Sequence, residues 1–246
     1  RPPRSTLFPY TTLFRSPELA KRYAFPDSLT SPWVRTCFVS SIDGAATDAS
    51  GLSGGFGGDD DSTIFHVWRS LADVIVVGAG TARAEGYGPV QPNEIHQDIR
   101  RDLGLAPLPP IAIVSGRLDI PETLIVPGQI LITSANSDPA RRVELAGTMD
   151  VIVAGSQAID WPEALRQLAE RGLLRIQCEG GPRLHGDLIG ADVVDELGVN
   201  FAAVLAGGPA PRIAHGPNAS AHAMRLADTI VGDGLLATRW IRDTTS

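Results

Sequence analysis

The sequence predicts an α/β fold with a mainly parallel central sheet, flanking helices and a C-terminal antiparallel hairpin. Apolar runs of strand length alternate with amphipathic stretches of helical period through most of the chain. The runs at 74–78 and 173–178 end in glycine turns that lead into expected helices. Beyond residue 195 the apolar runs have no helices between them, which indicates antiparallel strands at the edge of the sheet.

The expected strands are short apolar runs bounded by glycine, proline or polar residues. In chain order they are 33–40, 74–78, 111–115, 129–133, 150–154 and 173–178, followed by the terminal runs 195–205, 222–231 and 235–242. The expected helices are amphipathic stretches between these runs. In chain order they follow residue 58, lie near 94–103 within a proline-rich loop, follow residue 136, cover 162–171 and run from 182 to about 189.

The helix after residue 58 has an acidic start, and Asp59, Asp60 or Asp61 is expected to cap it. Its apolar face is expected to carry Ile64, Phe65, Trp68 and Leu71. The loop before it, 50–58, is rich in glycine, and we interpret it as a mobile cover for an active site.

The composition of the 246 residues is that of an ordinary globular protein, with 43% hydrophobic and 20% charged residues. A net charge of −7 without a basic cluster argues against a nucleic-acid partner, and the apolar runs are too short to span a bilayer. Cys37 and Cys178 lie in strand-like runs and are expected to be buried thiols of a cytoplasmic protein. The five histidines are scattered without metal-ligand spacing, so we expect no metal.

The first residues are expected to be foreign to the fold. The stretch 6–16 resembles a translated sequencing-adapter oligonucleotide, although a natural aromatic-rich arm is the alternative. We therefore expect three parts: a non-native segment at 1–16, an N-terminal arm at 17–32 and a single domain at 33–246. Deletion of the first part is expected to leave stability unchanged.

The two glycine turns predict a site for a nucleotide. A glycine turn between a parallel strand and a helix lets backbone amides approach a phosphate, where the helix dipole adds positive charge. The first turn, at Gly78, matches neither the GxGxxG fingerprint nor a P-loop, and leaves Thr81 as a phosphate contact or a plain helix cap. The second turn brings Gly181 and Pro182 to the start of a helix. Two such turns in one chain favour an extended dinucleotide.

Five polar residues are candidates for chemistry, each with a structural alternative. Glu179 is suited to bind the NH groups of a heterocycle or to cap exposed amides. Asp43 is a turn former or a proton donor, and Arg69 is a phosphate clamp or a solvated helix residue. Ser115 and Arg117 follow one another closely enough to bind the 2′-phosphate of NADP, or form a simple turn.

The order of these motifs resembles a known family. Ser-Ile-Asp-Gly at 41–44, His66-x-x-Arg69, Val-Gly-x-Gly-Thr at 77–81 and Glu-Gly-Gly-Pro at 179–182 resemble the reductase domain of the bacterial riboflavin deaminase-reductase, which has the dihydrofolate-reductase fold. The likeness covers about 33–242. The run Arg-Ala-Glu-Gly-Tyr at 83–87 is most similar to the stand-alone pyrimidine-reductase-like proteins of that family.

The resemblance implies an NADPH-dependent reductase that converts 5-amino-6-(5-phosphoribosylamino)uracil to its ribityl product, and a homodimer is expected. It implies cofactor contacts at Val39, Thr81, Ser115, Gly181, Pro182, Arg183 and Leu184, and the turns described above add Gly78 and Arg117 to the expected cofactor contacts. It implies substrate contacts at Ser53, Arg69 and Glu179, with Asp43 or Glu85 handling a proton or water.

One departure from the family pattern concerns the substrate. The riboflavin reductases usually carry a lysine on the first strand, where this chain has Cys37, and a thiol supplies no fixed positive charge. Two alternatives therefore stay open beside the pyrimidine reductase. One is a reductase of a dihydropterin or another flat heterocycle, and the other is an NADP-binding protein without turnover.

Overall fold

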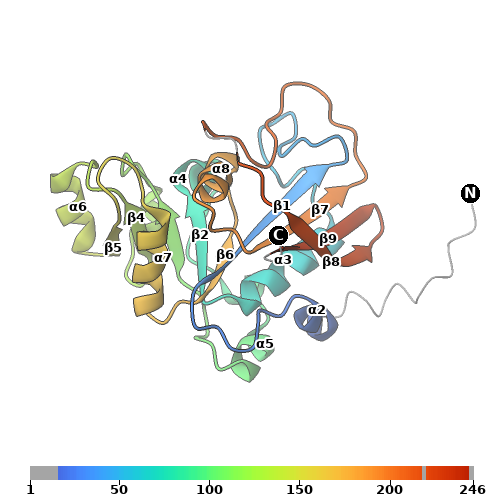
Figure 1. The fold of residues 1–246 in the computed structure, drawn as a ribbon, viewed down its shortest axis with the longest axis horizontal. Helices are drawn as coiled ribbons and strands as arrows, with labels where there is room; N and C mark the ends of the chain where they lie inside the picture. The colour runs from blue at the N-terminus through green and yellow to red at the C-terminus, as the bar shows by residue number, and fades with distance from the viewer. Residues whose placement is uncertain (1–15, 218–219, 244–246) are drawn as a thin grey trace, which may run out of the picture.

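The computed structural model describes residues 16–217 and 220–243, so nearly all of the adapter-like segment lies outside the described residues. The strands form one nine-stranded sheet in the order β5-β4-β3-β2-β6-β1-β7-β9-β8 (Figure 1). Their bounds are β1 Trp33–Ser41, β2 Val74–Gly78, β3 Ile111–Val114, β4 Ile130–Thr133, β5 Asp150–Val153, β6 Arg175–Cys178, β7 Glu196–Ala202, β8 Met224–Val231 and β9 Leu235–Arg242. The predicted α/β class with a mainly parallel sheet is confirmed.

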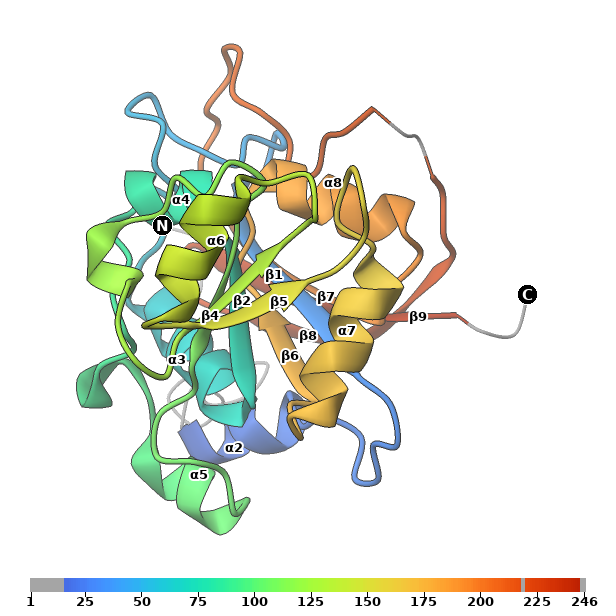
Figure 2. The same ribbon diagram turned by 90° about the vertical axis from the view of Figure 1, so that its left-hand side faces the viewer.

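Helices cover both faces of the sheet (Figure 2). Alternate residues of β2 show this directly, because Val76 packs with α7 and α8 while Val77 packs with α4 and α6. The helices are α2 Ser16–Arg22, α3 Asp59–Leu71, α4 Ala79–Ala84, α5 Gln97–Asp102, α6 Pro139–Ala146, α7 Trp161–Glu170 and α8 Pro182–Gly190, with short 3₁₀ turns η1 Pro92–Glu94 and η2 Glu122–Leu124. The inner parallel strands β2, β3, β4 and β6 are buried on both sides, which explains their continuous apolar runs.

The acidic start of α3 does not cap the helix as predicted. Its N-cap is Gly58, and no side chain caps it. Asp59, Asp60 and Asp61 instead occupy the first turn, where negative charge stabilises the helix dipole. By contrast, Asp160 caps α7 by accepting a hydrogen bond from the Glu163 amide at 3.0 Å. The sequence pattern located the start of α3 correctly but assigned the wrong role to its carboxylates.

The terminal strands also differ in part from the expectation. The β8–β9 hairpin is antiparallel as predicted, but β7 pairs parallel with β1 and antiparallel with β9. Helix α8 is the crossover that brings β7 back in the same direction as β6. Across the sheet, the first strand that runs in the opposite direction is therefore β9, the neighbour of β7. The run at 195–205 is therefore an interior strand of the sheet, where it was expected at an edge.

The arm before β1 packs against the sheet through a buried charge cluster. Leu19 and Tyr23 of the arm are fully buried against α3, and the Tyr23 ring meets Trp68 edge-on at 5.4 Å. Arg35 and Arg239 both donate to the Glu196 carboxylate, at 2.6 Å and 2.9 Å. Both arginines also donate to backbone carbonyls of the arm. The arm is thus tied to the sheet through one buried carboxylate.

We predict that Glu196→Gln lowers the free energy of unfolding by about 3–5 kcal/mol, because it leaves two arginines around an uncharged amide. Urea denaturation measures the loss. Glu170→Gln is the matched control, since the Arg166–Glu170 pair is solvent-exposed and its loss costs under about 1 kcal/mol. Equal losses in the two variants would show that the buried cluster stabilises the fold no more than an exposed ion pair does.

Candidate active site

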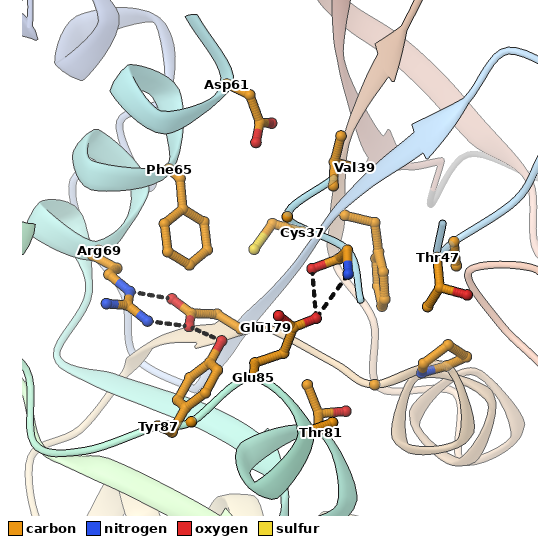
Figure 3. Close-up of a pocket in the computed structure, with 18 of the residues that line it drawn as sticks. Cys37, Val39, Thr47, Asp61, Phe65, Arg69, Thr81, Glu85, Tyr87 and Glu179 are labelled. Atoms are coloured by element: carbon orange, nitrogen blue, oxygen red, sulfur yellow. Dashed lines mark hydrogen bonds and ion pairs between the residues drawn. The ribbon is translucent and has the colours of Figure 1, made fainter. Parts of the chain in front are cut away.

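A cleft of about 720 Å³ opens at the carboxyl ends of β1, β2 and β6, the strands at the centre of the sheet. The chain leaves β2 through α4 on one face of the sheet and leaves β6 through α8 on the other face. A crevice between two crossovers on opposite faces is where open α/β sheets bind ligands. Its walls include Cys37, Phe38, Val39, Thr47, Ser53, Asp61, Phe65, His66, Arg69, Thr81, Glu85, Tyr87, Gln91, Glu94, Glu179, Gly181, Pro182 and His215 (Figure 3).

The two predicted glycine turns meet at one end of the cleft, because β2 and β6 are neighbours in the sheet. The Gly78 amide donates to the Gly180 carbonyl at 2.7 Å, and the Gly180–Gly181 peptide is cis. A Cβ on Gly181 would overlap the Thr81 hydroxyl, and Gly180 has φ +87° with the Phe38 ring against it. The backbone here approaches so closely that only glycine fits. Helix α8 starts at this point and directs its N-terminal amides at the cleft.

A buried histidine holds α8 in place. His185 shares a hydrogen bond with the Thr36 hydroxyl at 3.2 Å and another with the Ile213 carbonyl at 3.1 Å. Its ring stacks on Phe38 with centroids 4.6 Å apart. Burial lowers the pKa of His185 to about 4, so the ring is neutral at physiological pH and donates through Nδ1. The helix that borders the phosphate end of the cleft is thereby fixed to β1.

The opposite end of the cleft is built around Arg69 and Glu179. The guanidinium of Arg69 donates from Nε and Nη2 to the two oxygens of Glu179, both at 2.8 Å. Tyr87 donates its hydroxyl to Glu179 at 2.8 Å (Figure 3). Glu94 accepts from Arg69 Nη1 at 3.1 Å. Phe65 lies under the guanidinium at 4.5 Å. These side chains converge from α3, the end of β6, the loop after α4 and η1.

This network changes the roles that the sequence suggested. Arg69 and Glu179 were expected to bind separate parts of a substrate, but they bind each other as a buried bidentate pair. Burial alone would lower the pKa of Arg69, yet the charge of Glu179 and its hydrogen bonds raise the pKa above its usual value. Burial and the same carboxylate raise the pKa of Tyr87 well above its usual value, so the phenol stays protonated. Glu179 faces the cleft with its negative charge balanced and its orientation fixed.

Ser53 and Glu85, predicted as separate contacts, also bond to each other. The Ser53 amide and hydroxyl donate to one oxygen of Glu85, at 2.8 Å and 2.9 Å. This contact ties the glycine-rich loop at 50–58 to the end of α4 and closes one side of the cleft. The expectation that this loop covers the site is consistent with its place in the cleft wall.

The first strand contributes Cys37 and Val39 to the cleft wall. Burial, together with the charge of Glu179, raises the pKa of the Cys37 thiol well above its usual value. The thiol is therefore neutral, and it donates to the Cys178 carbonyl at 3.6 Å. Both cysteines are free and buried, as predicted. The position where the family resemblance expects a lysine thus holds an uncharged group.

Several predicted site residues do not line the cleft. Asp43 accepts from the Ser41 hydroxyl at 2.5 Å and from the amides of Ala206 and Gly207, and these bonds lower its pKa to about 2. Such a carboxylate stays ionised and joins two surface loops, so the turn-former alternative fits it and a proton donor does not. The others outside the cleft wall are Gly78 beneath the turns, Leu184 in the core, buried Ser115, and exposed Arg117 and Arg183.

The sequence analysis missed several polar residues that face the cleft, among them Tyr87, Glu94 and Asp61. Tyr87 and Glu94 lie in the proline-rich stretch, where a loop with a short helix near 94–103 was predicted and neither side chain was assigned to the site. Asp61 was assigned to a helix cap, but its side chain accepts from Asn200 of β7 at 2.7 Å, and burial raises its pKa. Tyr87 stands in the Arg-Ala-Glu-Gly-Tyr run that carried the family likeness, which was the one available signal.

Within the described ranges, no group of three or more His, Cys, Asp or Glu side chains is arranged to hold a metal ion. None of the helices in that part of the chain has the length and apolar composition that crossing a bilayer requires.

The fold and the cleft together define an α/β protein with a cleft at the carboxyl edge of a parallel sheet, where folds of this class bind ligands. The chain belongs to the RibD C-terminal domain family, whose model matches residues 32–233. A solved pyrimidine reductase-like protein from Corynebacterium diphtheriae is similar, with a TM-score of 0.73 and 27% identity over 86% of this chain and 92% of that one. A riboflavin biosynthesis reductase from yeast shares the fold at a TM-score of 0.66 and 17% identity, covering 92% and 99% of the two chains.

Curated relatives give the same picture. A riboflavin biosynthesis protein RibD from Bacillus amyloliquefaciens is 28% identical over 185 residues, which are 72% of this chain and 47% of the relative. The chain therefore spans about half the length of that protein. A 2,5-diamino-6-ribosylamino-4(3H)-pyrimidinone 5′-phosphate reductase from Archaeoglobus fulgidus is 27% identical over 182 residues, which are 72% of this chain and 83% of the relative.

We predict that Gly181→Ala destabilises the fold by about 1–3 kcal/mol, because the added Cβ overlaps the Thr81 hydroxyl. Adding Thr81→Ala is expected to recover most of that loss, since the next atom of Thr81 is 3.6 Å from the new Cβ. Urea denaturation of the two single variants and the double variant measures the coupling. A double variant no more stable than Gly181→Ala would place the strain elsewhere.

Proposed function

We propose that this protein is an NADPH-dependent reductase of riboflavin biosynthesis. Its substrate would be 5-amino-6-(5-phosphoribosylamino)uracil, and its product the corresponding ribityl compound. One observation carries the proposal: two glycine turns and the start of α8 meet at one end of a cleft, as a cradle for phosphate, and the other end presents a fixed carboxylate. The curated relatives named as riboflavin-pathway proteins and pyrimidine reductases support it.

The residues present fit a nicotinamide dinucleotide. The Thr81 hydroxyl fills the place where a Cβ of Gly181 would stand, so glycine lets Thr81 lie directly beside the start of α8. The α8 amides and the Thr81 hydroxyl would offer hydrogen bonds to a diphosphate there. Val39 on β1, which lines the cleft, would border the nicotinamide. When bound, NADPH supplies the hydride. A small-molecule substrate is the partner that this cleft fits, while a homodimer and a cytoplasmic location stay predictions.

The substrate end of the cleft would orient the pyrimidine. Glu179 accepts hydrogen bonds, and Arg69 and Tyr87 hold its two oxygens in one plane that faces the cavity. A heterocycle with ring NH and amino donors is complementary to such a carboxylate. The loop tied down by Ser53 and Glu85 would exclude water from the reacting atoms. The protein's contribution is orientation in a partly closed cleft.

A second candidate has one observation in its favour. Arg69 is already bound by two carboxylates, and Cys37 replaces the lysine that the family resemblance leads one to expect. A substrate without a phosphate, such as a dihydropterin, needs no further cation. Steady-state NADPH oxidation with the phosphorylated pyrimidine and with dihydrofolate separates these candidates. Turnover of dihydrofolate alone would replace the first proposal, and turnover of neither would leave an NADP-binding protein without activity.

We predict that Glu179→Gln lowers kcat/KM for the pyrimidine by about thirty- to a hundredfold, because the variant loses a charge-assisted acceptor. Glu163→Gln is the matched control, since Glu163 forms the same bidentate contact with Arg166 on the exposed face of α7. NADPH affinity, measured by fluorescence, is expected to change in neither variant. A loss of NADPH affinity in Glu179→Gln would move the cofactor to this end of the cleft.

The cofactor preference is tested separately. We predict that NADPH binds at least about ten times tighter than NADH, because Ser115 and Arg117 follow β3 beside the cradle and suit a 2′-phosphate. Arg117→Ala is expected to remove most of this preference, while Arg141→Ala on the distant surface of α6 leaves it unchanged. Equal dissociation constants for the two cofactors in the unaltered protein would contradict the assignment.

A further inference from the structure

Arg69 has two kinds of partner in the cleft. Its Nε and Nη2 atoms contact Glu179 at 2.8 Å, and the Glu179 side chain is only 2% exposed. Its Nη1 atom contacts Glu94 at a longer 3.1 Å, and the Glu94 side chain is 36% exposed. The first contact is buried and bidentate, whereas the second is single and open to solvent. An incoming anion can therefore exchange with Glu94 far more readily than with Glu179.

Glu94 sits on a short element that faces the cleft. It is the last residue of the 3₁₀ turn η1, and its second oxygen accepts from the Gln91 amide at 2.7 Å. That second bond holds the carboxylate over Arg69 without using Arg69 itself. A three-residue turn with no buried residues can release one contact without disturbing the core.

The charges around Arg69 leave little attraction for a phosphate. Among the described residues that line the cleft, Arg69 is the only arginine or lysine, and two carboxylates already offset its charge. His66, on the same helix face, adds no charge at neutral pH because burial and Arg69 lower its pKa. A phosphate dianion beside Arg69 would therefore meet net negative charge unless Glu94 leaves.

We infer that Glu94 is a specificity-determining residue whose carboxylate competes with a substrate phosphate for Nη1 of Arg69. In the absence of substrate, Glu94 occupies the position that a phosphate oxygen takes. Binding of a phosphorylated substrate displaces it, so Glu94 sets how strongly the site distinguishes phosphorylated from unphosphorylated ligands. The inference rests on the proposed function, because it takes the ligand to be the phosphorylated pyrimidine and places the phosphate of that substrate beside Arg69.

The test compares Glu94→Gln and Glu94→Ala with the unaltered protein. Glu94→Gln keeps the size of the side chain and an acceptor for the Gln91 amide, and Glu94→Ala removes both. Glu122→Gln is the matched control, because Glu122 is an exposed glutamate in the other 3₁₀ turn, outside the cleft. The probes are ribose 5-phosphate and ribose, titrated by calorimetry, and the phosphorylated pyrimidine and its dephosphorylated form in steady-state kinetics with NADPH.

Both Glu94 variants are expected to bind ribose 5-phosphate about three- to tenfold tighter than the unaltered protein, with no gain for ribose. KM for the phosphorylated pyrimidine should fall by the same factor, while kcat and the KM of the dephosphorylated form stay constant. The control variant should change none of these values.

Two results would overturn the inference. One is equal binding of ribose 5-phosphate to all variants, which includes the case of no binding at all. The other is an equal gain in the Glu94 variants for phosphorylated and unphosphorylated probes. Failure of the proposed function gives a different result, in which no variant oxidises NADPH with either pyrimidine. The calorimetric comparison still decides the role of Glu94 in that case, because it needs no turnover.

Discussion

The buried pair of Arg69 and Glu179 is the constraint on which the cleft depends. It joins the middle of the molecule to one flanking helix, because Glu179 follows β6 and Arg69 lies near the end of α3. Removing two charges from water is costly, and the cost is offset here by a bidentate contact, by the Tyr87 hydroxyl and by Glu94. Every element that supplies a partner is thereby held at a fixed distance from the end of β6.

The pair also sets the chemistry of the two ends of the cleft. At one end the glycine turns and the start of α8 offer backbone amides, which suit phosphate groups. At the other end the carboxylate of Glu179 faces the cavity with its charge balanced by Arg69. The Cys37 thiol of β1 also lines the cleft, and because it is neutral it adds no charge to this end. The two ends of the cleft therefore differ: one offers backbone amides, and the other offers the Arg69–Glu179 pair with its partners.

Much of the fold could be predicted because apolar periodicity reports burial directly. Strands β1 to β6 agree with their predicted ranges within two residues, and the glycine turns stand at the ends of β2 and β6 as expected. The direction of β7 could not be predicted, because a run of apolar residues carries no information about its neighbours in the sheet. The burial of the arm at Leu19 and Tyr23 was missed for the same reason, since only contacts distant in sequence create it.

The sequence by itself determined the fold class, the family and the residue types available at the carboxyl edge of the sheet. Local patterns encode those features, because strand burial, helix starts and glycine turns each depend on a few consecutive residues. Tertiary structure alone decided which of those residues meet. Arg69 and Glu179 are 110 residues apart, and their pairing turned two predicted substrate contacts into one internal network. Asp43 lies in a surface turn, and Glu94, which was not predicted as a site residue, lies in the cleft. Each position depends on the packing of loops distant in sequence, which no local pattern records.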